Sequence, residues 1–171
     1  MLDNGGQQIM DQVELLTAII EASVALIGFS GLVIALGRRS SGEWSPAEKL
    51  RLRLLLGIGV ILLACTLLAL TLLSAGLSPA AVWALSSVAW VVLVLPFTVW
   101  GFSSAFRMAE DRTVSATYRV VVAAVMVATA ASQVANAIFL QEFWPFFLGL
   151  AVLLIIGVTQ FFRLLWFGLF R

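Results

Sequence analysis

Two carboxylates inside the first long apolar stretch are the residues with the clearest chemical potential. Glu14, Glu21 and Gly28 follow one another at intervals of seven, and Ala35 continues the series. Seven residues make nearly two turns of a 3.6-residue helix, so these positions share one helical face. An ionised carboxylate near the centre of a bilayer costs on the order of 3 kcal/mol, so it faces a bundle interior or a water-filled path. The spacing predicts an acidic, small-residue face suited to a cation path.

The composition places these carboxylates in a membrane protein. The chain has 171 residues, of which 62% are hydrophobic and 11% are charged. Soluble domains are about 45–50% apolar and about 25% charged. The net charge of +1 gives no reason to expect a nucleic-acid partner. The chain has no histidine and one cysteine, Cys65, so we expect no disulfide, no zinc site and no cofactor.

The apolar runs predict an all-α, polytopic fold with five transmembrane helices in a single domain over 1–171. Each run offers at least the roughly 20 residues that cross a bilayer core. The start of the chain lacks the basic segment of a signal peptide, so we expect the first span to be retained. Ser45, Pro46 and Glu48 predict a capped helix start before the second span. The predicted spans are 12–37, 54–76, 79–105, 118–140 and 145–166.

The basic residues predict the orientation of these spans. All ten fall on one side of a five-span chain, five of them in the 38–53 loop, and the other side has only acidic charges. Because cytoplasmic loops carry an excess of Lys and Arg, we expect the N-terminus outside and the C-terminus in the cytoplasm. The 38–53 loop is then a basic cytoplasmic loop, in which Arg51 and Arg53 could meet lipid phosphates. We expect a multi-pass protein of a plasma membrane, such as the bacterial inner membrane.

This orientation predicts a polar layer in the outer half of the bundle. Glu21, Ser87 and Gln133 each lie about seven residues from the outer end of their spans, roughly 10 Å deep. Asn136 shares a helical face with Gln133. Such a layer predicts a site open to the outside. The alternative is a structural layer in which Glu21 is protonated and bonds to Gln133 or Asn136.

Three classes of function fit these residues. The first is a homo-oligomeric cation channel in which Glu14 and Glu21 form acidic rings and Gly28 leaves a narrow inner path. The second is a non-catalytic accessory or scaffold subunit whose acidic face binds a membrane partner protein. The third is a lipid- or small-molecule-binding protein that uses the outer polar layer, with Trp83 and Trp90 nearby, as its pocket. An enzyme is not expected, because no nucleophile, base and metal-ligand constellation is present.

Overall fold

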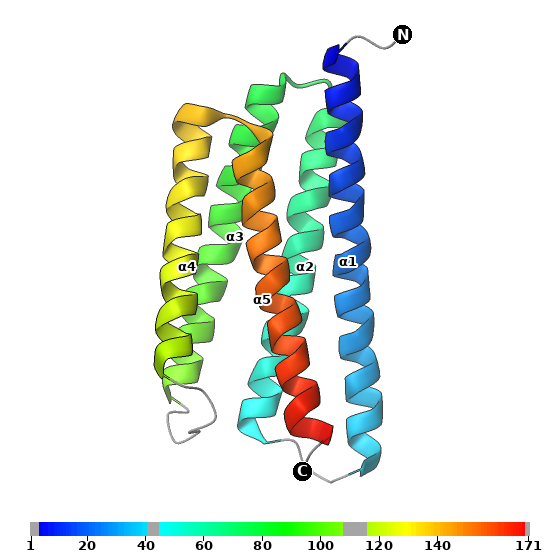
Figure 1. Ribbon diagram of the computed structural model, residues 1–171, viewed down its shortest axis with the longest axis vertical. Helices are drawn as coiled ribbons and strands as arrows, with labels where there is room; N and C mark the ends of the chain where they lie inside the picture. Colours follow the sequence, from blue (N-terminus) through cyan, green and yellow to red (C-terminus); the bar gives the residue numbers. More distant parts are fainter. Residues whose placement is uncertain (1–3, 41–44, 108–115, 170–171) are drawn as a thin grey trace.

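The computed structural model describes residues 4–40, 45–107 and 116–169, and these form five long helices packed side by side (Figure 1). A five-residue π-helix, η1, directly follows the fourth helix. The elements in chain order are α1 (Asn4–Ser40), α2 (Pro46–Ser74), α3 (Pro79–Arg107), α4 (Ala116–Ala135), η1 (Asn136–Leu140) and α5 (Phe143–Leu169).

Each long helix is apolar and long enough to span a membrane. The five candidate spans run for 23 to 29 residues with mean hydropathies of 1.8 to 2.6. The prediction of an all-helical chain with five such helices is confirmed. The bounds of the spans are Gly6–Ile34, Pro46–Ser74, Pro79–Ala105, Thr117–Leu140 and Phe143–Leu165.

The start of α2 has the predicted capping box. The Glu48 backbone N–H donates to Ser45 Oγ at 3.2 Å, and the Ser45 backbone N–H donates to Glu48 Oε2 at 2.8 Å. Pro46 occupies the first helical turn, where a missing N–H costs nothing. Two otherwise unpaired donors are thereby satisfied, so the helix begins at a defined residue.

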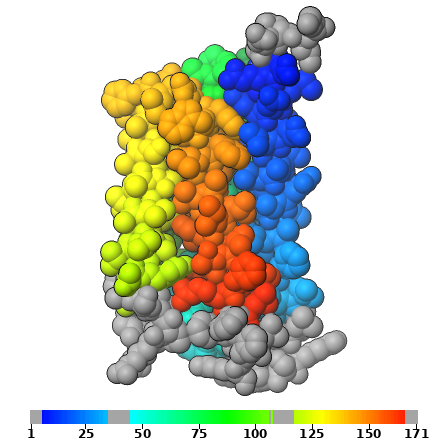
Figure 2. Space-filling model, viewed as in Figure 1, coloured from blue at the N-terminus to red at the C-terminus, as the bar shows by residue number. Residues whose placement is uncertain are grey.

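The helices form a bundle in which α5 is central. It packs against α1, α2, α3 and α4, whereas α1 packs against α2 and α5. Figure 1 shows α1 and α4 at opposite edges, and Figure 2 shows α5 between them on the visible face. The fully buried side chains of the core include Leu16, Leu55, Leu62, Trp90, Phe146 and Leu150.

Glycines allow close helix contacts on both sides of α2. A Cβ on Gly59 would lie 2.8 Å from Ile27 Cγ1 of α1. A Cβ on Gly157 of α5 would lie 3.1 Å from Ile58 Cγ2 of α2. Such close approach strengthens van der Waals packing, which matters most where lipid supplies no hydrophobic drive between helices.

The antiparallel order gives the bundle a basic end and an acidic end. At the basic end α1, α3 and α5 finish, and α2 and α4 begin. Six described basic residues outside α1 lie there: Lys49, Arg51, Arg53, Arg107, Arg119 and Arg163. The opposite, acidic end carries Asp11, Glu14 and Glu142. Arg112 and Arg171 lie outside the described residues.

Candidate functional site

The acidic face of α1 points away from the bundle. Glu14, Glu21 and Gly28 are all exposed. A Cβ placed on Gly28 would meet nothing within 4 Å, so no contact within the described part of the chain requires glycine there. The prediction that these positions share one helical face is consistent with their common exposure. The side chain of Ala35 lies outside the described residues.

The opposite face of α1 packs into the bundle. Leu16, Ile19 and Leu26 are buried there. Ser23 and Ser30 are also buried, and their hydroxyls donate to the carbonyl oxygens of Ile19 and Leu26 at 2.6 and 2.7 Å. Because these hydroxyls are satisfied within their own helix, they form no site.

A cluster of polar groups around Asn136 forms the junction between η1 and α5. Asn136 Nδ2 donates to Ser87 Oγ of α3 at 2.8 Å and to the Glu142 carbonyl oxygen at 3.0 Å. Asn136 Oδ1 accepts from the Glu142 backbone N–H at 3.0 Å. One amide therefore bonds both polar groups of the same backbone residue and also ties this turn to α3. Gln141 takes the left-handed conformation, with φ 54°, in the middle of the turn.

Gln133 joins this cluster from the preceding turn of α4. Its Nε2 donates to the carbonyl oxygen of Pro145 at 2.5 Å. A Cβ on Gly149 would lie 2.6 Å from this nitrogen and 3.1 Å from Trp90 Nε1, so only glycine gives the amide room. Three buried atoms here have no hydrogen-bond partner among the described residues: Ser86 Oγ, Trp90 Nε1 and Gln133 Oε1.

The alternative in which Glu21 bonds to Gln133 or Asn136 is wrong. Ser87, Gln133 and Asn136 are 0% exposed, and the Asn136 and Gln133 amides bond groups of α3 and of the segment from Glu142 to Pro145. Glu21 lies on the exposed face of α1, at the edge of the bundle opposite α4 (Figure 1). Helical periodicity placed these residues at a common depth, but depth does not determine which helices are neighbours.

A residue expected beside the outer pocket is buried. Trp83 is 3% exposed. Its ring packs against Phe143 and Phe146 at centroid distances of 5.0 and 6.1 Å. Trp83 therefore belongs to the aromatic packing at the acidic end of the bundle.

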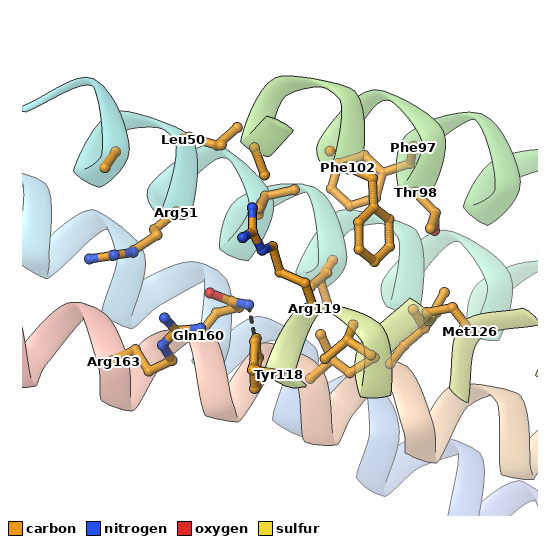
Figure 3. Close-up of a pocket in the computed structure, with 18 residues that line it drawn as sticks. Leu50, Arg51, Phe97, Thr98, Phe102, Tyr118, Arg119, Met126, Gln160 and Arg163 are labelled. Atoms are coloured by element: carbon orange, nitrogen blue, oxygen red, sulfur yellow. Dashed lines mark hydrogen bonds between the residues drawn. The ribbon is translucent and has the colours of Figure 1, made fainter. Parts of the chain in front are cut away.

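A pocket lies instead at the basic end, between α2, α3, α4 and α5. Its volume is about 160 Å³. Arg51, Arg119 and Arg163 line it together with a largely apolar wall, as Figure 3 shows. Arg51 is only 8% exposed, so its side chain lies within the bundle and not on the open surface of the basic end.

The helices and these sites define the class of protein: an all-helical chain with five helices able to cross a membrane. Comparisons of the chain with protein-family models, with curated proteins and with solved structures find no match. The described residues hold no group of three or more His, Cys, Asp or Glu side chains that could bind a metal ion. The two features that bear on function are the exposed acidic face of α1 and the pocket at the basic end.

Proposed function

We propose that the protein is a homo-oligomeric cation channel of the plasma membrane, with the acidic face of α1 at the subunit interface. One observation carries the proposal: Glu21 is exposed on the outward face of a membrane-length helix. No hydrogen bond or ion pair of Glu21 occurs within the described part of the chain. In a lone chain this face would contact lipid, where a carboxylate is unfavourable.

Small residues on the same face support close contact with another helix. Ala18, Ala25, Gly28 and Gly31 are exposed beside Glu21. No atom of the described residues lies within 4 Å of a Cβ placed on Gly28 or Gly31. Glycine disfavours a helix by about 1 kcal/mol relative to alanine. Two glycines on an exposed face therefore lower the stability of the helix unless another interaction compensates. Close packing against a second helix would compensate, because small residues let the two backbones approach closely.

Among the described residues, the interior of the bundle is filled largely by apolar side chains. Leu16, Leu62, Trp90 and Phe146 are 0% exposed and lie between the helices. A hydrated cation needs polar ligands or water along its path. A conducting path would therefore run between chains, where copies of Glu14 and Glu21 would form two acidic rings.

The orientation belongs to the same proposal. The basic end would face the cytoplasm, in keeping with the excess of Lys and Arg in cytoplasmic loops. The N-terminus and Glu14 would then lie on the outside, and Glu21 would lie about two turns deeper. A cation entering from outside would meet the Glu14 ring before the Glu21 ring.

Ion flux into liposomes tests the channel. Reconstituted protein is expected to pass K⁺ in preference to Cl⁻, and Glu21→Gln is expected to lower this flux at least tenfold, because it removes one ring of charge. Glu142→Gln is the matched control, since Glu142 is exposed at the acidic end but lies outside α1. Cation flux that is unchanged in both Glu21→Gln and Glu14→Gln would overturn the acidic-ring mechanism.

A second candidate is a non-catalytic accessory subunit whose α1 face binds a different membrane protein. The exposed glycines favour it equally, because they fit any closely packed helix. Two copies carrying different affinity tags separate the candidates. Capture of one tagged copy by the other is expected for the homo-oligomer. Absence of such capture, together with a stoichiometric second membrane protein, would favour the accessory subunit.

A further inference from the structure

We infer that the pocket at the basic end binds an amphiphile with an oxyanion headgroup, such as a carboxylate or a phosphate, on an alkyl chain. This site is separate from the α1 face and does not depend on the proposed channel. It lies between α2, α3, α4 and α5, the four helices other than α1.

The lining of the pocket changes regularly with depth. Arg51, Arg119 and Arg163 come from three different helices. Each has an apolar lining residue seven positions further into its helix: Ile58, Met126 and Ile156. A position seven residues further along a helix lies on nearly the same face, about 10 Å deeper. Figure 3 shows the three arginines toward one end of the cavity and Phe97, Phe102 and Met126 toward the other. The pocket therefore has a cationic mouth and an apolar floor.

The charge of the mouth selects an anion. Three guanidinium groups line a single cavity, and none of the described residues that line it is acidic. Each guanidinium has five N–H donors and no acceptor, so it can bond the oxygens of an anion in addition to the interactions that these arginines already make. Guanidinium groups match the planar, two-oxygen edge of carboxylates and phosphates, which they bind with paired hydrogen bonds.

One of these guanidinium groups is held in place by its neighbours. Arg163 lies over the ring of Tyr118, with its Cζ 4.5 Å from the ring centroid. The Tyr118 hydroxyl accepts a hydrogen bond from Gln160 Nε2 at 3.2 Å, which joins α4 to α5 (Figure 3). All three side chains line the pocket. A mouth that is positioned before the ligand arrives loses less conformational entropy on binding.

The size and wall of the pocket define the rest of the ligand. A volume of about 160 Å³ is below the roughly 300–1,000 Å³ of pockets that enclose a drug-sized ligand. It accommodates a headgroup and the first carbons of one alkyl chain. The deeper wall is apolar, as a chain requires, and includes Leu54, Phe97, Met126, Leu153 and Ile156.

Titration of the full-length protein with dodecyl phosphate in neutral maltoside micelles tests this site. Calorimetry is expected to show saturable binding with one ligand per chain, and dodecyltrimethylammonium is expected not to bind. Arg51→Gln is expected to raise the Kd at least tenfold, because a charge-assisted contact is lost. Arg53→Gln, a matched change at an exposed residue outside the pocket, is expected to alter the Kd less than twofold.

Two further variants keep the test decisive if Arg51→Gln does not fold. Arg119→Gln changes a half-buried guanidinium of the same mouth, and it should weaken binding at least tenfold. Ile156→Trp fills the floor while all three arginines remain, and it should also weaken binding at least tenfold. Equal effects of the pocket variants and Arg53→Gln, or equal binding of the cationic amphiphile, would overturn the proposal.

The same pocket could take its ligand from the bilayer or from solution. Nanodiscs containing phosphatidylglycerol, competed with dodecyl phosphate, distinguish these sources. Tighter binding of phosphatidylglycerol assigns the pocket to a bilayer lipid, and tighter binding of dodecyl phosphate assigns it to a free single-chain amphiphile. Both outcomes support an anionic-amphiphile site, whereas binding of neither ligand overturns it.

Discussion

Asn136 is the residue on which the junction between η1 and α5 most depends. Its amide makes three hydrogen bonds, to Ser87 Oγ and to both backbone groups of Glu142. Replacement by alanine leaves these buried partners unsatisfied. We expect Asn136→Ala to lower the free energy of unfolding by about 1–3 kcal/mol.

Reversible unfolding in mixed micelles, followed by circular dichroism, measures this loss. Ser132→Ala is the matched control, because Ser132 lies about one turn before Asn136, in α4, and has no hydrogen bond among the described residues. A loss of stability that is the same for the two variants would show that the Asn136 amide does not stabilise this junction.

Gly149 and Gly28 are expected to respond in opposite ways to the same change. A Cβ on Gly149 would lie 2.6 Å from Gln133 Nε2, so Gly149→Ala must displace a buried, hydrogen-bonded amide. A Cβ on Gly28 would meet no atom of the described residues within 4 Å, so Gly28→Ala is expected to gain helix propensity without a clash. Unfolding in micelles should show Gly149→Ala less stable and Gly28→Ala no less stable than the parent monomer. Greater stability of Gly149→Ala would contradict the described packing.

At the scale of the element, helix starts and helical faces could be predicted from sequence. The capping box of Ser45 and Glu48 needs only local spacing, and it is observed. The seven-residue interval of Glu14, Glu21 and Gly28 likewise predicts a shared face. Periodicity does not tell whether that face points inward or outward, because this depends on which helices become neighbours. For this reason Glu21 was wrongly expected beside Gln133 and Asn136.

The α1 face makes a prediction of its own. Gly28→Leu adds a bulky side chain where the lone chain has space, so the fold of the monomer should survive. If α1 packs against a second α1, the same side chain must hold the backbones apart. We expect Gly28→Leu to shift the protein toward monomers in analytical ultracentrifugation. Ala124→Leu, at an exposed small residue of α4, should leave assembly unchanged. Identical assembly of Gly28→Leu and the parent would exclude this face as the interface.

At the scale of the whole molecule, the number of helices follows from the apolar runs. The basic residues gather at one end because they lie around the α1–α2 and α3–α4 connections and near the end of α5, which the antiparallel order brings together. The basic-end pocket could not be predicted in the same way. Arg51, Arg119 and Arg163 are far apart in the chain, and each alone resembles an ordinary basic flank of a membrane helix. Only the packing of α2, α4 and α5 brings them to one cavity.

The central claim is that copies of α1 meet along their acidic face, and disulfide crosslinking in the membrane tests it most directly. In a Cys65→Ala background, Ala25→Cys places a thiol on the exposed face beside Glu21, and Val127→Cys places one on the exposed face of α4. Mild oxidation is expected to crosslink chains through position 25 and not through position 127. Efficient crosslinking only through position 127, or through neither position, would contradict an assembly built around α1.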